Sequence, residues 1–405
     1  MTVMKYNFDE IIDRSNTASV KYDLRKMIFG TEQVIPMWVA DMDFRTPPFI
    51  LEAIKKRAEH PVLGYSVRPD SYYESIQSWL LRHHDWSIEK DWICFSPGIV
   101  AALNMAVLAF TKPADCIIIQ PPVYFPFYGA VKDNGRKLLL NSLKIVNGRY
   151  EMDLQDFEQL CKKGAKMVLI SNPHNPGGNA WTKDELKALA DICIKYDVLM
   201  VSDEIHCDLV NMGYRHTILA SLSKKIASKT ITMMAPSKTF NIAALSTSSV
   251  IISNTKLRLK YNELVQGLHI DMGNVFGAVA SIAAYEQGDE WLSQLLVYIN
   301  SNIDFLEKFL REKVPQIKMM RPEATYMAWL DCSGLGMDHQ ELNEFMINKA
   351  GIGLNPGIQF GKEGAYFMRI NLACPLSTLK ASLSQLEKAV KEYNYQVQKS
   401  DSTVA

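Results

Sequence analysis

The sequence predicts an α/β protein, with a mostly parallel central sheet in a large domain and a smaller α+β domain. Between about residues 90 and 255, short apolar runs alternate with stretches of helical spacing, which is typical of strands joined through helices. Several of these runs are apolar throughout, as expected of strands that helices cover on both faces. The chain has 405 residues, more than one hydrophobic core usually organises, so two domains are expected.

Seven strands are expected in the large domain, because each run is short, apolar and followed by polar or turn-forming residues. They are DWICF (91–95), CIIIQ (116–120), KLLLN (137–141), KMVLIS (166–171), VLMVS (198–202), TITMM (230–234) and SSVIIS (248–253). Helices are expected between strands at IVAALNMAVLAF (99–110) and KDELKALADICIKY (183–196), where apolar residues recur with helical spacing.

A second domain is expected from about residue 290, where the pattern changes. The expected elements are a long helix at 290–313, strands around 325–331 and 366–372, and a final helix near 376–393. We therefore expect a large domain at 46–288, a small domain formed by 1–45 with 289–395, and a flexible polar tail at 396–405.

Composition narrows the classes of partner and compartment. Lys+Arg and Asp+Glu both number 44, and this zero net charge favours neither nucleic acid nor an anionic membrane as a partner. The start, MTVMKYNFDEIIDRSN, is interrupted by charges and does not resemble a signal peptide, and no apolar window of about 18 residues predicts a membrane span. Seven cysteines without CxxC pairs indicate free thiols in a reducing compartment, so we expect a cytoplasmic protein.

Four stretches that follow expected strands carry candidate site residues, and ligands of such sheets bind at the carboxyl ends of the strands. In FSPGIVAAL (95–103), Gly98 stands between a strand and a helix whose first N–H groups could bind a phosphate. In SNPHNPGG (171–178), two Asn-Pro pairs define a turn that can aim the Asn175 amide inward. Taken alone, each stretch is equally compatible with an ordinary rigid turn.

The third stretch, SDEIHCDL (202–209), places Asp203 and Glu204 directly after a run expected to be buried. A buried carboxylate requires a cation. A metal site built from Asp203, His206, Cys207 and Asp208 is one alternative, which we disfavour because no further ligand accompanies them at metal-binding spacing. A positively charged ring nitrogen is the better partner.

The fourth stretch, APSKTFN (235–241), places Lys238 just past the expected strand at 230–234. Together the four stretches supply an amine for a Schiff base, an aspartate for a pyridinium nitrogen, a phosphate site and an amide for a phenolic oxygen. This combination predicts pyridoxal 5′-phosphate (PLP) as the cofactor. No metal is expected.

With these motifs, the chain resembles the fold-type I PLP enzymes. More narrowly, it is similar to the carbon–sulfur lyases of the cystathionine β-lyase/cystalysin type, in the class-II-like aminotransferase family. The motifs that carry the resemblance are VKYDLR (20–25), PMWVADMDF (36–44), VLGYS (62–66), PPVYFPF (121–127), NPHNPGG, SDEIHCDL, APSKTFN and MRINLA (368–373).

The resemblance implies a role for each matching residue. Lys238 would carry the cofactor as a Schiff base and act as the acid–base. Asp203 would keep the ring nitrogen protonated, and Tyr124 would stack on the ring. Asn175 would donate to the phenolic oxygen, and His206 stands where many aminotransferases have a tyrosine.

Further roles concern the phosphate and the substrate. Ser237 and the backbone N–H groups of Ile99 and Val100 would bind the phosphate. Tyr65 would reach the phosphate of a neighbouring subunit, which implies a homodimer. Arg369 would hold the carboxylate of an amino-acid substrate, since a planar guanidinium can bind both oxygens. Without the resemblance, Arg369 could equally be a surface ion-pair residue.

The implied reaction is α,β-elimination of L-cystathionine or L-cysteine-type substrates to pyruvate, ammonia and a thiol, either homocysteine or sulfide. The same residues could run transamination, so a PLP-dependent aminotransferase is the alternative, and a PLP-fold protein with a secondary regulatory role is another. Three positions depart from the pattern of relatives: Ala235 and Ser246 near the phosphate, and Ala324 where glycine is expected.

Overall fold

The computed structural model describes residues 5–404 and, within them, the side chains of residues 5–395. The described residues form two compact units. The larger unit comprises Thr46–Leu296 with Glu323–Thr325, and the smaller unit comprises the residues up to Arg45, Val297–Pro322 and the residues from Tyr326 onward.

The larger unit is built on a seven-stranded sheet in the order β2-β10-β9-β8-β7-β3-β4. The strands are β2 (Ile93–Ser96), β3 (Cys116–Ile119), β4 (Lys137–Leu140), β7 (Met167–Ser171), β8 (Leu199–Asp203), β9 (Thr230–Met234) and β10 (Ser248–Ile251). Only β10 runs antiparallel to its neighbours in this sheet. The expected mostly parallel sheet is confirmed, and each strand ends within one or two residues of its expected bounds.

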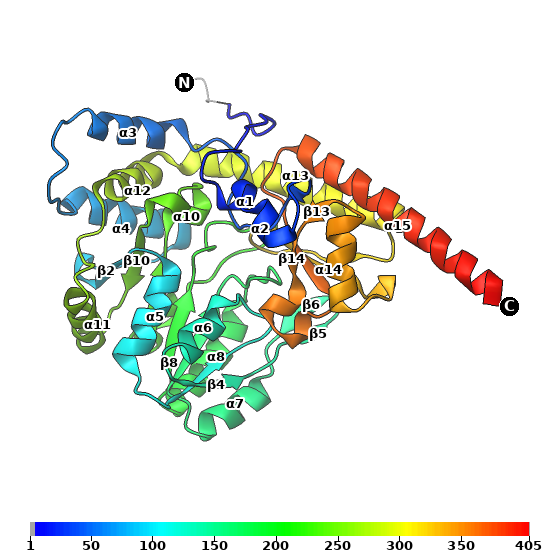
Figure 1. The fold of residues 1–405 in the computed structure, drawn as a ribbon. Coiled ribbons are helices and arrows are strands. Elements are labelled where there is room, and N and C mark those ends of the chain that lie inside the picture. Colours follow the sequence, from blue (N-terminus) through cyan, green and yellow to red (C-terminus); the bar gives the residue numbers. More distant parts are fainter. Residues whose placement is uncertain (1–4, 405) are drawn as a thin grey trace. The chain divides into compact units, whose positions relative to one another are not determined.

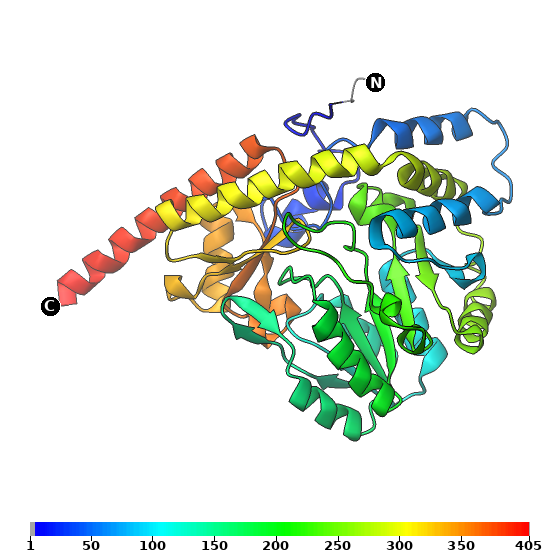
Figure 2. The same ribbon diagram turned by 180° about the vertical axis from the view of Figure 1, so that it is seen from behind.

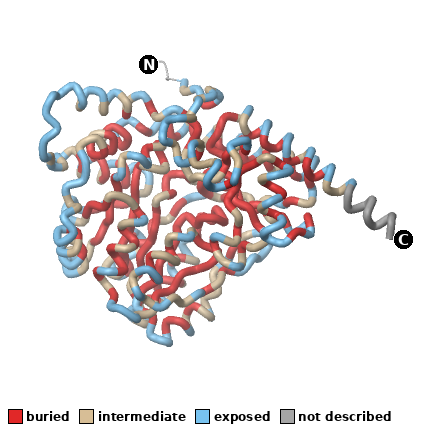
Figure 3. Tube along the Cα trace, in the orientation of Figure 1, coloured by how far each residue is buried: buried red, intermediate tan, exposed pale blue. Residues whose placement is uncertain are grey.

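Helices cover both faces of this sheet (Figures 1 and 2). The helices that lie wholly in the larger unit are α3 (Pro48–Ala58), α4 (Asp70–His84), α5 (Ile99–Phe110), α6 (Pro126–Lys132), α7 (Leu154–Lys162), α8 (Lys183–Lys195), α9 (Lys224–Ala227), α10 (Pro236–Thr239), α11 (Thr255–Gly267) and α12 (Val275–Gln287). A hairpin of β5 (Lys144–Val146) and β6 (Arg149–Glu151) lies outside the sheet. Buried residues follow the central strands (Figure 3), as the unbroken apolar runs require.

The smaller unit contains a four-stranded antiparallel sheet in the order β11-β12-β15-β14. Its strands are β11 (Lys318–Met320), β12 (Met327–Asp331), β14 (Asn355–Pro356) and β15 (Phe367–Asn371), and β1 (Ile35–Pro36) pairs separately with β13 (Ile352–Gly353). Its helices are α1 (Val20–Asp23), α2 (Arg25–Phe29), α14 (His339–Asn348) and α15 (Leu376–Val404), and α13 (Asp289–Lys313) has residues in both units.

The C-terminal segment differs from the expectation of a tail at 396–405. Helix α15 continues to Val404 and therefore includes most of that segment. The chain after Pro375 has neither proline nor glycine, so no residue in it strongly opposes a helix. None of the helices within residues 5–404 combines the length and the apolarity needed to cross a membrane.

Candidate active site

The sheet order places three of the candidate residues at one edge. Asp203 is the last residue of β8 and pairs with Ser171 of β7 on one side and with Met233 of β9 on the other. The loop after β7 carries Asn175, and the turn after β9 carries Lys238. Because the three strands are parallel neighbours, their carboxyl ends bring these residues together.

Asp203 is a buried carboxyl with a raised pKa. Burial raises the pKa to about 7, although the backbone N–H of Ile205 and the charge of Lys238 act in the opposite direction. The Ile205 N–H donates to Oδ1 at 3.2 Å. A second cation beside this carboxyl would return it to the ionised form, so the site suits a protonated ring nitrogen.

Glu204, the buried residue that follows Asp203, has a different environment. Its Oε1 accepts from the Ser202 hydroxyl at 2.8 Å and from the Leu219 N–H at 3.1 Å. Its Oε2 lies 2.7 Å from Nε2 of His216. These bonds satisfy the buried carboxylate within the protein, so Glu204 is a structural residue and Asp203 is the candidate for the cofactor.

Lys238 lies on α10, a single helical turn. Ala235 before it is extended, and Pro236 occupies the first turn, where a missing N–H costs nothing. Ser237 and Lys238 are half-buried, whereas Thr239 and the following phenylalanine are buried in the core. The turn is therefore anchored at both ends by buried residues, and its two central residues, Ser237 and Lys238, are the more accessible ones.

The loops after β3 and β7 hold Tyr124 and Asn175 together. The Tyr124 N–H donates to the Asn175 carbonyl at 3.1 Å. His174 ties the same loops, because its Nε2 lies 2.8 Å from the Pro122 carbonyl and its Nδ1 lies 3.3 Å from the Gly177 nitrogen. The Pro122 carbonyl can only accept, so Nε2 carries a hydrogen and donates to it. The Gly177 N–H donates to Nδ1, which therefore carries no hydrogen, so the imidazole ring is neutral. Burial agrees, since it lowers the pKa of His174 to about 4.

The amino end of α5 offers a phosphate cradle. The helix begins after Gly98, has no side-chain cap and has no acidic residue in its first turn. A Cβ atom added at Gly98 would meet no atom within 4 Å, so space is open there. The first N–H groups, including those of Ile99 and Val100, are consequently available to an anion. Ile99 itself is buried and Val100 is exposed.

The expectation that no further metal ligand accompanies Cys207 and Asp208 was wrong. His84 at the end of α4 joins them, and the ligand atoms of the three lie within 4.8 Å of one another. Hydrogen bonding accounts for the group, because Asp208 accepts from His84 at 2.7 Å, from the Cys207 thiol at 3.6 Å and from two further donors described below. Burial, with the charge of Asp208, raises the pKa of Cys207 well above its usual range, which disfavours the thiolate that binds metals. His84 stands 124 positions away in the chain, and no local pattern marked it.

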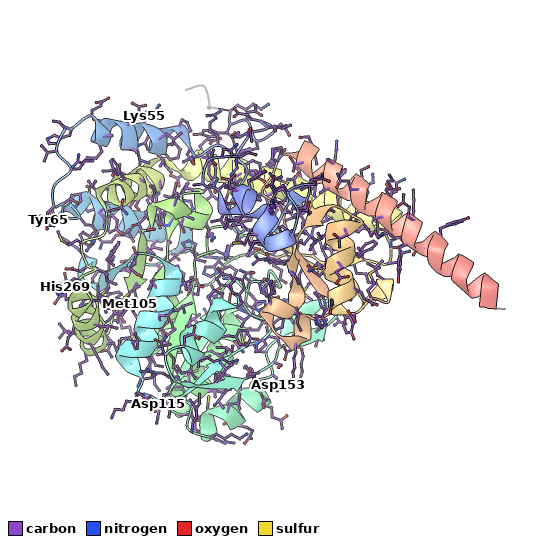
Figure 4. All side chains as sticks on the ribbon, in the orientation of Figure 1. Lys55, Tyr65, Met105, Asp115, Asp153 and His269 are labelled. Carbon is purple, nitrogen blue, oxygen red and sulfur yellow. The ribbon has the colours of Figure 1, made fainter. Side chains whose placement is uncertain are left out.

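Three other expected residues lie in different surroundings. His206 is buried in the turns that follow β8. Tyr65 lies at the edge of the larger unit, 98% exposed (Figure 4). Arg369 on β15 belongs to the smaller unit and is buried, so it is not a surface ion-pair residue. Its Nη2 donates to the Trp38 carbonyl at 3.1 Å and to Asn355 Oδ1 at 2.7 Å.

Ala324 is buried and fixed by its backbone. It forms an antiparallel bridge with Val210, and its N–H donates to the Gly178 carbonyl at 2.8 Å. The preceding Glu323 forms an ion pair with Arg149 at 2.8 Å. The backbone of Ala324 thus connects Val210, in the segment after His206, to Gly178 at the end of the Asn-Pro loop. Ser246 is exposed and adopts a left-handed backbone with φ of 46°.

These residues fit PLP by the chemistry of their donors and acceptors. An amine and a buried carboxyl suit the aldehyde and the ring nitrogen, which lie at opposite ends of the pyridine ring. The open amino end of α5 suits the phosphate. Every requirement is met by residues of the larger unit.

Comparisons with known proteins agree with this fit. The family described as "Aminotransferase class I and II" matches residues 32–386. Cystathionine beta-lyase PatB of Bacillus subtilis (strain 168) is 42% identical over 385 residues, which cover 95% of this chain and 100% of the relative. Cystalysin from Treponema denticola, whose crystal structure contains PLP, superposes with a TM-score of 0.94 at 40% identity and covers 96% of this chain and 100% of its own. The PLP-bound C-S lyase from Staphylococcus hominis superposes with a TM-score of 0.89 at 35% identity, covering 96% and 98% of the two chains. The expected fold-type I architecture is confirmed.

Proposed function

Because this chain belongs to the class I and II aminotransferase family and uses PLP as its cofactor, we propose that it is a carbon–sulfur β-lyase. Its substrates would be amino acids of the L-cystathionine or L-cysteine type. The observation that carries the proposal is the presence of Lys238 near a buried Asp203, whose pKa its charge lowers, at one edge of the sheet, in a chain similar to PatB and cystalysin over nearly its whole length.

The cofactor supplies an electron sink for negative charge that develops at the substrate α-carbon. Lys238 removes the α-proton onto Nζ, and Asp203 keeps a proton on the ring nitrogen. The Cβ–S bond then breaks, and sulfur leaves as a thiolate with the bonding electron pair. The remaining three-carbon enamine takes up one water molecule to give pyruvate and ammonia.

Substrate binding is proposed to depend on Arg369. A buried guanidinium that already donates to the Trp38 carbonyl and to Asn355 is held in one orientation. A guanidinium held in this way binds both oxygens of a carboxylate with little loss of conformational freedom. The amino acid would be oriented by this contact, so that its α-proton points at one group.

A homodimer is also proposed, on the evidence of the loop around Tyr65. Val62, Leu63 and Val67 are 61%, 61% and 85% exposed, so this loop presents apolar side chains to solvent. Contiguous exposed apolar residues indicate a protein–protein contact. Light scattering of the purified protein should give twice the mass of the chain, and a monomeric mass would contradict the dimer.

The test of the function is to incubate the purified protein with PLP and L-cystathionine, without any keto acid, and to assay pyruvate, ammonia and free thiol. We expect all three in equal amounts. L-serine is the matched control, because hydroxide is a far poorer leaving group than a thiolate, and it should react much more slowly. No release from L-cystathionine, followed by amino transfer once a keto acid is added, would make the protein an aminotransferase. If the protein catalyses neither reaction, the result would favour a regulatory role.

A further inference from the structure

Asp208 is a buried carboxyl five positions after Asp203, and it accepts a hydrogen bond from Thr239, the residue that follows Lys238. Burial raises its pKa, but hydrogen bonds from His84, Thr239 and Trp79 outweigh this and lower the pKa to about 2. The group is therefore a permanent carboxylate that can only accept. In Asp203, five positions earlier, the effect of burial exceeds that of the hydrogen bond and the nearby charge, and the pKa rises to about 7.

Three of the donors to Asp208 come from two separate helices, and a fourth is the thiol of the adjacent Cys207, whose Sγ lies 3.6 Å from Oδ1. The Trp79 indole N–H and His84 Nε2, both on α4, lie 3.0 and 2.7 Å from Oδ1. The Thr239 hydroxyl on α10 donates to Oδ2 at 2.7 Å. One oxygen thus faces a long, stable helix, and the other faces the turn that carries the lysine.

Helix α10 depends on such tertiary contacts. A single turn of four residues has too few internal hydrogen bonds to define its own position. Thr239 is fully buried and follows Lys238 directly. The ring centroid of the next residue, Phe240, lies 5.5 Å from that of Trp79, so α4 contacts the turn directly at Phe240 and, through Asp208, at Thr239.

Asp208 is also coupled to Asp203 through the backbone. The segment between them is closed by bonds from the Cys207 N–H to the Glu204 carbonyl and from the Leu209 N–H to the His206 carbonyl, at 3.0 and 2.9 Å. Because this segment is short and closed by hydrogen bonds, Asp203 is expected to move together with Asp208. A shift of Asp208 relative to α10 would therefore change the separation between the Asp203 carboxyl and the Lys238 amine.

We propose that Asp208 is a positioning residue, which sets Lys238 relative to Asp203 through the hydroxyl of Thr239. This inference rests on the proposed function only in that both use Lys238 as the base. A small displacement of a reacting group can reduce a rate by about 100-fold, so a hydroxyl outside the site can control the proton transfer.

The test compares two threonines of the larger unit. Thr239→Val removes the hydroxyl that reaches Asp208. Thr230→Val is the matched control, because Thr230 is also fully buried and its hydroxyl donates to the Ile226 carbonyl at 2.8 Å, at the opposite end of β9. Thr239→Ser keeps the hydroxyl and should restore the wild-type behaviour. Asp208→Asn is the partner variant.

Two measurements do not depend on elimination. One is the rate at which apoprotein takes up PLP, followed by the visible absorption of the bound cofactor. The other is the exchange of the α-proton of L-alanine for solvent deuterium, since L-alanine has no leaving group. We expect Thr239→Val and Asp208→Asn to slow both by about 10- to 100-fold, with the half-saturating L-alanine concentration within about threefold of wild type.

The controls separate position from stability. Thr230→Val should lower the melting temperature as much as Thr239→Val does, yet keep both rates within about twofold of wild type. Equal rates in these two variants would overturn the proposal and leave Thr239 a purely structural residue. If wild type exchanges the α-proton but releases no pyruvate from L-cystathionine, the proposed function fails and the positioning role stands.

Discussion

At the scale of single residues, the larger unit shows how burial and local partners separate carboxyl groups of similar sequence context. Asp203 has one backbone donor and the charge of Lys238, and its pKa rises to about 7. Asp208 has four side-chain donors, and its pKa falls to about 2. The difference favours Asp203 as the candidate for the cofactor and Asp208 as a residue of the scaffold, because only the incompletely compensated carboxyl gains from a further cation.

Replacement of Lys238 by alanine is the first prediction at this scale. The variant should lose turnover by about three orders of magnitude or more, together with the visible absorption of the bound cofactor, because no other amine is proposed to act there. Circular dichroism should be unchanged. Lys225→Ala, an exposed position on α9, is the control and should behave as wild type. Full activity in Lys238→Ala would contradict the assignment.

The second prediction at this scale concerns how the stability of the apoprotein depends on pH. Burial raises the pKa of Asp203 to about 7, above the usual 3.8, so the folded state keeps a proton that the unfolded chain releases. The free energy of unfolding should fall as the pH rises between these values, by up to about 1.4 kcal/mol per pH unit, with the loss complete above about pH 7. Asp203→Asn apoprotein has no carboxyl to titrate and should lack this component. Denaturant unfolding between about pH 5 and about pH 8 checks it, and parallel curves for the two proteins would refute it.

At the scale of elements, the site is a set of loops at the carboxyl ends of parallel strands, and each loop is held by a specific bond. His174 joins the loop after β3 to the loop after β7, and Asp208 joins α4 to α10. Loops have few backbone bonds of their own, so such side chains define their positions. The Asn-Pro motif was recognisable from sequence, but its partner at Pro122 was not.

His174→Phe tests this bracing. The phenyl ring keeps the volume but leaves the Pro122 carbonyl and the Gly177 N–H buried without their partner, so the free energy of unfolding should fall by about 2–3 kcal/mol. The affinity for PLP should also fall, because Tyr124 and Asn175 sit on the same loops. Urea denaturation and cofactor titration measure the two effects. His339→Phe, at an exposed position, is the control and should change neither quantity. If His174→Phe has the stability and PLP affinity of wild type, the positions of the loops do not depend on His174.

At the scale of the whole molecule, each unit contains its own network of buried or half-buried ions. In the larger unit, Arg149 pairs with Glu185 and Glu323. In the smaller unit, Lys21 is 1% exposed, and its Nζ lies 2.7 Å from Asp43. This second pair joins VKYDLR to PMWVADMDF, so the two motifs are in direct contact in the folded chain.

Lys21→Met should therefore destabilise the smaller unit strongly. Removing one partner leaves the other charge buried, which typically costs about 3–5 kcal/mol. Arg14 remains within 2.7 Å of Asp43, so a value near the lower end is expected. Lys187→Met, which breaks an exposed pair with Asp191, should cost no more than about 0.5 kcal/mol. Chemical unfolding of both variants measures the loss in the free energy of unfolding. Equal losses would show that the buried pair stabilises the protein no more than a surface pair.

The sequence by itself determined the parallel sheet and the cofactor, because apolar runs and strand-end motifs are local patterns. It predicted the edge at which ligands bind, and the resemblance carried by its motifs predicted the roles of Lys238 and Asp203. Only the tertiary structure showed that Glu204 is satisfied through His216, and it brought His84 and Thr239 to Asp208. The state of a buried carboxyl depends on donors that packing brings from distant parts of the chain, and local sequence does not contain that information.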